Sequence, residues 1–255
     1  MKILKYKKVS KNKYKIFLDN DANITLYEDV IINNNLLIKK EVSSEELLNI
    51  EKENNNISTY EIALNYIEIK MRSTKEIKDY LKKKNIDSKL IDIAVNKLIK
   101  NGYLNDYLYA KAFVNDEFNL TNKGPLKIKK DLKKHDIKDD VINELISNID
   151  YKDILNKLDK LINKMLKIKK GGVNSIKIKI VNYFINLGYE KGMILGVLDN
   201  YIITSDVSIL KKEYNKLYSK YSKKYDGEYL NYFVSSKLLQ KGYTKEEINN
   251  VINNN

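Results

Sequence analysis

One apolar pattern recurs four times along this chain of 255 residues, and successive copies are 51, 52 and 54 residues apart. Each copy is anchored on one large apolar or aromatic residue: Ile86, Ile137, Tyr189 and Tyr243. Five residues after each anchor stands an isoleucine: Ile91, Ile142, Ile194 and Ile248. Five residues before each anchor stands another apolar residue: Leu81, Leu132, Phe184 and Leu238. Self-similarity at a nearly fixed period is typical of repeat proteins, so the sequence predicts a tandem array.

Each copy is predicted to form three helices, because the chain has only one proline and nine glycines to interrupt them. The first helices are expected near 58–71, 105–119, 151–169 and 205–222; the second near 74–84, 125–134, 174–187 and 227–241; the third near 88–101, 138–148, 190–202 and 244–253. Four Ser/Thr-x-x-Glu capping boxes predict helix starts: Ser43 with Glu46, Ser58 with Glu61, Ser73 with Glu76, and Thr244 with Glu247. Gly102 is expected to end a helix.

The turn between the second and third helix carries a residue suited to the left-handed conformation in every copy. Gly188 and Gly242 stand there in the last two copies, and Asn85 and Asp136 in the first two. Asn and Asp tolerate this conformation better than other residues that have a side chain.

The first 42 residues differ from the rest. Polar and apolar residues alternate over 13–18, the period of a half-buried strand, and Ile3 to Val9 and Ile24 to Tyr27 indicate two more strands with a turn at Asn20-Asp21. The predicted fold is therefore mostly α, an elongated array of four three-helix repeats with a small β-rich N-terminal segment. Its divisions are a cap over 1–42, a connecting helix or linker over 43–57, and repeats over 58–104, 105–149, 150–204 and 205–255. Stacking is expected because one unit of this size buries little surface alone.

Composition narrows the class of protein. The absence of cysteine excludes disulfides and thiolate zinc sites, and it fits a reducing compartment. No apolar run is long enough for a transmembrane helix, no strongly amphipathic basic helix suggests attachment to a membrane surface, and the charged start does not resemble a signal peptide. We therefore expect a cytoplasmic, monomeric protein without membrane association. The net charge of +13 fits a polyanionic partner or an acidic protein surface, but a lysine-rich proteome would produce the same total.

The placement of the charge is more informative than its total. The second helices of the first two copies are rich in lysine, whereas the third helix of the second copy is acidic through Asp136, Asp139, Asp140 and Glu144. This sorting predicts one basic and one acidic face. The sorting disfavours a helix-turn-helix reader of DNA sequence. Such a reader places the helix that follows the turn against the bases and phosphates, and here that helix is the acidic third helix of the copy. The candidate partner- or DNA-binding residues on the basic face are Arg72, Lys75, Lys78, Lys82, Lys127, Lys130, Lys133, Lys134, Lys177 and Lys179.

No set of residues predicts catalysis. His135 is the only histidine, so neither a usual metal site nor a usual catalytic triad is expected, and a surface or capping role is predicted for it. Gly171-Gly172 lacks the context of a phosphate-binding loop and indicates a helix break. We therefore expect a protein that is not an enzyme and that binds neither a cofactor nor a metal ion. The tyrosine stripe Tyr214, Tyr218, Tyr221 and Tyr225 is compatible with both core packing and a contact surface that stacks on bases.

Three blocks of the sequence resemble the RecX regulatory proteins. They are Met71-Arg72-Ser73 with Glu76, Ile77 and Leu81; Gly102-Tyr103-Leu104-Asn105-Asp106 with Tyr109, Ala110 and Phe113; and Lys123-Gly124-Pro125 with Ile128 and Leu132. The N-terminal residues Tyr14 to Asp19 and Glu28-Asp29 resemble the β-rich leader of the longer members. The resemblance extends over essentially the whole chain, but it is tight in the first two repeats and weak over 150–255. Asn105 replaces the usual first aspartate, and the turns at Asn85 and Asp136 lack the usual glycine.

The resemblance implies a non-catalytic modulator of the RecA recombinase, with a role in homologous recombination, DNA repair and the SOS response. Such a protein binds the RecA–DNA filament and inhibits or tunes filament extension, ATP hydrolysis and strand exchange. Several weak contacts along a filament add through effective concentration. The alternative is a helical repeat protein that binds single- or double-stranded nucleic acid non-specifically and independently of RecA; its affinity would fall steeply with salt.

Overall fold

The computed structural model describes residues 1–253, and the chain divides into two compact units. The first unit consists of Met1–Tyr109 together with His135–Ile137. The second consists of Ala110–Lys134 and the chain from Lys138 onward. The protein is mostly helical, with a single small sheet among the described residues, as the sequence predicted.

The N-terminal sheet has three antiparallel strands in the order β1-β2-β3. They are β1 (Ile3–Ser10), β2 (Lys13–Leu18) and β3 (Asn23–Tyr27), so the three strands predicted from the sequence are present, with bounds that differ by at most one residue. Asp21 makes the expected turn with φ of 60°. One face of the sheet packs on the short helix α1 (Glu28–Asn33) and on α2 (Ser44–Ile69) around Ile16, Leu26, Val30 and Ile50. Helix α1 is not apparent from the sequence pattern.

Helix α2 corrects one prediction. The capping box at Ser43 and Glu46 is present, but Ser58 with Glu61 does not start a helix, because α2 runs without interruption through both residues. Asn54 lies within 43–57, the predicted connecting helix or linker, at the place where α2 meets the sheet. The Asn54 side chain accepts a hydrogen bond from the Tyr27 amide (2.9 Å) and donates one to the Thr25 carbonyl (3.1 Å). These contacts satisfy a polar residue that helix propensity alone disfavours.

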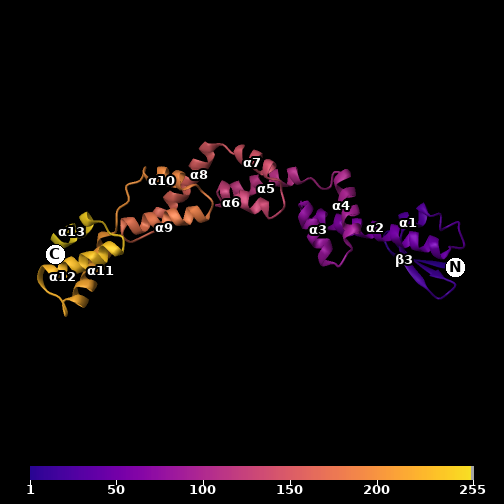
Figure 1. Cartoon of the computed structure of the whole chain (residues 1–255), viewed down its shortest axis with the longest axis horizontal. Helices are drawn as coiled ribbons and strands as arrows, with labels where there is room; N and C mark the ends of the chain where they lie inside the picture. Colours follow the sequence, from indigo (N-terminus) through magenta and orange to yellow (C-terminus); the bar gives the residue numbers. More distant parts are fainter. Residues whose placement is uncertain (254–255) are drawn as a thin grey trace. The chain divides into compact units, whose positions relative to one another are not determined.

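The remaining helices follow in groups of three (Figure 1). After α2 come α3 (Thr74–Lys83) and α4 (Ser88–Lys100). Then follow α5 (Asp106–Leu120), α6 (Pro125–Lys133) and α7 (Asp139–Ser147), and after these α8 (Tyr151–Leu166), α9 (Val173–Asn186) and α10 (Lys191–Leu198). The last group is α11 (Val207–Tyr221), α12 (Gly227–Gln240) and α13 (Lys245–Asn253).

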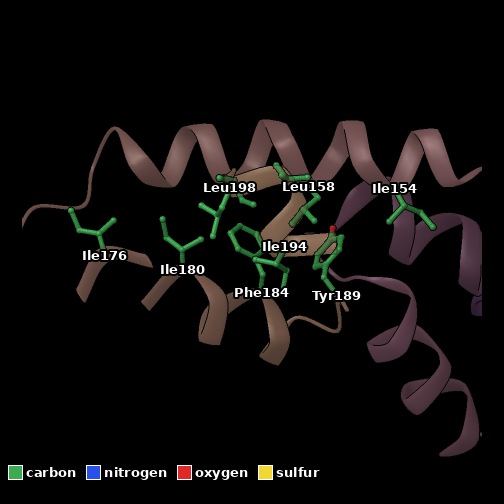
Figure 2. Close-up of a cluster of buried hydrophobic side chains, with 10 residues drawn as sticks. Ile154, Leu158, Ile176, Ile180, Phe184, Tyr189, Ile194 and Leu198 are labelled. Atoms are coloured by element: carbon green, nitrogen blue, oxygen red, sulfur yellow. The ribbon is translucent and has the colours of Figure 1, made fainter. Parts of the chain in front are cut away.

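The recurring apolar positions form the cores of these groups. All four isoleucines that follow the anchors are 0–1% exposed, and so are the four residues that precede the anchors by five positions. Figure 2 shows the core shared by α8, α9 and α10, where Phe184 and Tyr189 lie among Leu158, Ile194 and Leu198. The period seen in the sequence is therefore the period of core packing.

The predicted turn and cap residues have the expected backbone geometry. Asn85 and Asp136 have φ of 58° and 55°, and Gly188 and Gly242 have φ of 88° and 89°. The capping boxes at Ser73 and Thr244 are both formed. Gly102, with φ of 78°, ends α4: its amide donates to the Ile99 carbonyl, and the Tyr103 amide donates to the Leu98 carbonyl.

Glycine pairs join successive groups within the second unit. A Cβ added to Gly124, before α6, would lie 2.6 Å from the Gly188 carbonyl oxygen, and one added to Gly172, before α9, would lie 2.4 Å from the Gly242 carbonyl oxygen. The Leu126 amide donates to the Gly188 carbonyl (3.0 Å), and the Asn174 amide donates to the Gly242 carbonyl (2.9 Å). Each left-handed turn therefore binds the N-terminal amides of the second helix in the preceding group. Gly172 does mark the expected helix break, and it is also part of this contact.

Candidate partner-binding surface

The candidate basic residues lie on the second helices α3, α6 and α9 or just beside them, and the structure separates them into paired and unpaired groups. Three lysines form ion pairs with acidic residues beyond their own helix. These pairs are Lys75 with Asp136 (3.3 Å), Lys78 with Asp92 (2.9 Å) and Lys133 with Asp139 (2.7 Å). Two of these lysines, Lys75 and Lys133, thus lie beside acids that the sequence assigned to a separate face. The expected separation into a basic and an acidic face is only partial for this reason.

Asp131 is the centre of a partly buried charge network on α6. Its carboxylate accepts hydrogen bonds from Lys123 Nζ (2.9 Å) and Lys134 Nζ (2.6 Å), and Lys127 Nζ lies 3.9 Å away. Lys123 also pairs with Glu117 (3.0 Å). Burial alone would raise the pKa of Asp131, but the hydrogen bonds from Lys134 and Lys123 outweigh it and hold the pKa below its usual value. The network attaches the loop that carries Lys123 to α6, and it partly neutralises Lys127 and Lys134.

Arg72 packs against an aromatic ring and a carboxylate of its own protein. Its guanidinium lies over the Tyr66 ring, 3.9 Å from the centroid, and 3.7 Å from the Glu76 carboxylate. Its side chain is only 10% exposed. Since Tyr66 also stacks on Tyr80 at 3.9 Å, Arg72 connects the end of α2 with α3. These contacts give Arg72 a role in the folded structure, so it is not among the proposed contact residues.

Four candidate lysines are exposed and form no ion pair within residues 1–253: Lys82, Lys130, Lys177 and Lys179. Lys82 lies on α3, Lys130 on α6, and the other two on α9. Their charge is available to a partner without breaking an existing pair. Sequence reasoning could not separate them from the paired lysines, because the pairing acids lie 3 to 61 residues away along the chain.

His135 helps to hold the turn between α6 and α7. Its Nδ1 lies 3.3 Å from the Tyr109 hydroxyl, and the two rings are 5.4 Å apart. Burial, followed by the charge of Glu76, raises the pKa of Tyr109. Among residues 1–253 no group of three His, Cys, Asp or Glu side chains is arranged to hold a metal ion, and no helix there is long and apolar enough to cross a membrane.

Lys157 on α8 fixes the end of α5. Its ammonium donates hydrogen bonds to the carbonyls of Phe118 and Lys123 and lies 4.4 Å from the centroid of the Phe118 ring. Burial lowers the pKa of Lys157. A cation suits the C-terminal end of a helix, where carbonyl groups lack partners.

The tyrosine stripe on α11 is mainly a packing feature. Tyr214 is buried, and Tyr221 and Tyr225 are half-buried against Phe233 at ring distances of 4.8 and 4.9 Å. Tyr218 is 40% exposed. Of the two interpretations left open by the sequence, packing therefore accounts for three of the four rings.

These features define a class: a helical repeat protein with three-helix units and exposed lysines on their second helices. Comparison with known proteins places it more closely. Residues 60–98 match the family model "RecX, first three-helix domain", and residues 105–146 match "RecX, second three-helix domain".

Full-length relatives agree with the domain matches. The chain is 31% identical to "Regulatory protein RecX" of Streptococcus agalactiae serotype Ia over 256 residues, covering 99% of this chain and 98% of the relative. It is 31% identical over 258 residues to the protein of the same description from Streptococcus gordonii, with 99% and 98% covered. The chain belongs to the RecX family of regulatory proteins.

Solved structures show the same fold. A crystal structure of regulatory protein RecX superposes with a TM-score of 0.66 at 21% identity, covering 78% of this chain and 98% of that one. The crystal structure of RecX from Lactobacillus salivarius gives a TM-score of 0.53 at 26% identity, covering 57% of this chain and 96% of that one.

Proposed function

We propose that this protein regulates the RecA recombinase by binding the RecA–DNA filament, and that it inhibits filament extension, ATP hydrolysis and strand exchange. Membership in the RecX family carries the proposal. The repeat construction supports it, because a series of similar units can contact several filament subunits at once. The protein acts by binding, as a cytoplasmic monomer, without a cofactor.

The exposed lysines without ion pairs are the proposed contact residues. In the second unit these are Lys130, Lys177 and Lys179. Paired lysines such as Lys133 contribute less, because a partner has to compete with the carboxylate that already holds them. Charges at the edge of an interface act mainly on association rate and on salt dependence.

The direct test is the ATPase activity of RecA on single-stranded DNA, titrated with this protein. The expected result is a fall in the rate that saturates at a fixed ratio of this protein to RecA. A pull-down with RecA, with and without single-stranded DNA and ATP, identifies the species that is bound. An unchanged ATPase rate together with unchanged filament length near saturation would contradict the proposal.

The alternative function is non-specific binding of nucleic acid without RecA. Its signature is tight binding of DNA alone, with log affinity falling linearly against log salt. If such binding occurs while the RecA ATPase stays unchanged, the alternative replaces the regulator.

A further inference from the structure

The N-terminal sheet has a higher charge density than the rest of the protein. Residues 1–27 contain seven lysines and two aspartates, a net charge of +5 out of +13 for the whole chain. Both aspartates, Asp19 and Asp21, lie at the turn between β2 and β3. The strands themselves therefore carry positive charge only.

The strand register collects four of these lysines on one face. Residues that stand directly opposite each other in an antiparallel pair share a face, as do alternate residues along a strand. Lys7 stands opposite Lys15, and Lys5 stands opposite Phe17; Lys13 is two positions before Lys15. On the third strand, Asn23, Thr25 and the buried Tyr27 continue this face, so no acidic side chain interrupts it. Lys13 Nζ lies 4.4 Å from the centroid of the Tyr27 ring. The other face carries Ile16 and Leu26, which are 1% exposed, and packs into the core.

Folding does not explain this arrangement. Like charges directly opposite each other destabilise a sheet, and a Lys–Glu pair at the same positions would stabilise it. None of Lys5, Lys7, Lys13 and Lys15 forms an ion pair within the described chain, although Lys2 at the edge of the same segment pairs with Glu41. A surface that places like charges opposite each other and holds them without an ion pair is suited to a polyanion.

An aromatic ring lies among the lysines. Phe17 is half-buried, is absent from the buried cluster beneath the sheet, and has Lys15 Nζ 5.5 Å from its ring centroid. A sheet face with cations around an aromatic ring is a common platform for single strands, because phosphates meet the lysines while an unpaired base stacks on the ring. A duplex keeps its bases stacked internally and gains nothing from the ring.

We propose that this face of the N-terminal sheet, formed by Lys5, Lys7, Lys13, Lys15 and Phe17, binds single-stranded nucleic acid. This site lies on different elements from the α6 and α9 lysines proposed to contact RecA, and it functions without RecA. The protein thereby holds the strand separately from its contact with the filament.

The test uses the full-length protein, without RecA, and a fluorescently labelled oligothymidine strand of about 20 nucleotides, with fluorescence anisotropy as the readout. K7Q/K15Q removes two phosphate contacts, so the slope of log affinity against log salt should become shallower by about 1.4. With that difference in slope, a fourfold rise in salt costs the wild-type protein about sevenfold more affinity than it costs the variant. F17L should lower affinity by about fivefold or more with an unchanged salt slope, because it removes stacking but no charge.

K7E separates binding from folding. It places a carboxylate directly opposite Lys15 in the cross-strand pair, so the melting temperature should stay the same or rise while affinity for the strand falls. A residue with a purely structural role would not give that combination. The matched control is K89Q/K100Q. It removes two exposed lysines on α4 that have no ion pair in the described part of the chain. Its affinity for the strand should stay within about twofold of the wild-type value.

Each result decides the matter. Unchanged affinity and slope in K7Q/K15Q overturn the proposal, and so does an equal loss in K89Q/K100Q, which would show that total charge alone matters. If K7Q/K15Q lowers affinity for a matched duplex as much as for the single strand, and F17L has no effect, the face binds the backbone of a duplex and not a single strand. If K7Q/K15Q loses binding to vesicles with anionic headgroups while its affinity for the strand is unchanged, the face binds a membrane surface instead. None of these outcomes depends on RecA, so the proposal can fail while the regulator function stands.

Discussion

The backbones of Gly124 and Gly188 lie directly against each other. The Gly124 amide donates a hydrogen bond to the Leu187 carbonyl at 2.7 Å, and no side chain fits between the two residues. Gly124 belongs to the Lys-Gly-Pro block that resembles RecX proteins, and Gly188 is the left-handed residue of the next turn. The sequence indicated Gly124 only through this resemblance and Gly188 only for its turn, whereas the structure shows that the two glycines pack against each other.

Gly188→Ala should lower the free energy of unfolding of the second unit by about 2–4 kcal/mol. The new Cβ would lie 2.2 Å from the Lys127 amide nitrogen, and a φ of +88° is itself unfavourable for alanine. Chemical denaturation followed by circular dichroism measures the loss.

Gly196→Ala is the matched control for the glycine contact. Gly196 lies inside α10 with open space around it, so alanine should stabilise the helix by about 0.5–1 kcal/mol. An equal loss of stability in both variants would contradict the role assigned to the contact.

Tyr189→Phe should leave stability at pH 7 unchanged or raise it by up to about 1 kcal/mol, because the buried Tyr189 hydroxyl has no hydrogen-bond partner among residues 1–253. Burial raises the pKa of Tyr189 to about 12. A group whose pKa is higher in the folded state contributes stability below its unfolded pKa, near 10, and loses it as pH rises toward the folded value. The wild-type protein should therefore lose about 1 kcal/mol relative to the variant by pH 11. Parallel denaturation curves from pH 9 to 11 would refute this.

Asp131→Asn should lower the free energy of unfolding by about 1–3 kcal/mol at pH 7, since it removes the charged partner of Lys134 and one of the two carboxylates that pair with Lys123. The pKa of Asp131 is depressed in the folded protein, so its contribution is present above the unfolded pKa near 4 and is lost as pH falls further. The difference between the two proteins should accordingly shrink below about pH 4, as urea denaturation at pH 7 and pH 3 would measure.

Asp92→Asn is the control for the Asp131 network. Asp92 pairs with Lys78 at 2.9 Å, but both side chains are exposed to solvent (59% and 39%). Its loss should cost less than about 1 kcal/mol. Similar losses in the two variants would mean that burial around Asp131 adds nothing.

K130E/K177E/K179E should weaken binding to the RecA–DNA filament by about tenfold, with the larger effect at low salt, because each change reverses an exposed charge without breaking an ion pair. Biolayer interferometry on immobilised filament measures this, and circular dichroism checks folding. The triple variant K152E/K160E/K164E carries the same charge change on α8. An equal weakening there would attribute binding to net charge and not to the second helices.

The predicted elongated stack is tested by small-angle scattering. A compact protein of this length has a radius of gyration of about 18 Å, and the predicted array should give a clearly larger value. A value at or below the compact one would contradict it.

The sequence alone determined the local structure and the period. Apolar spacing located the helices and the residues of each core, because an amphipathic helix has to bury one face whatever its neighbours are. Capping boxes at Ser43, Ser73 and Thr244 and left-handed residues at Asn85, Asp136, Gly188 and Gly242 are short-range devices that the sequence shows directly. Ser58 was the exception: it has the pattern of a cap, but the helix began earlier and packing against β3 kept it intact.

Only the tertiary structure decided which charges are free. Lys133 and Lys130 look alike in sequence, yet Asp139 neutralises the first, and the second has no ion pair within the described residues. The lysine face of the N-terminal sheet likewise depends on strand register, which brings Lys7 beside Lys15. Pairing of side chains and of strands depends on distances in space between residues far apart in the chain, and helical or strand periodicity carries no information about those distances.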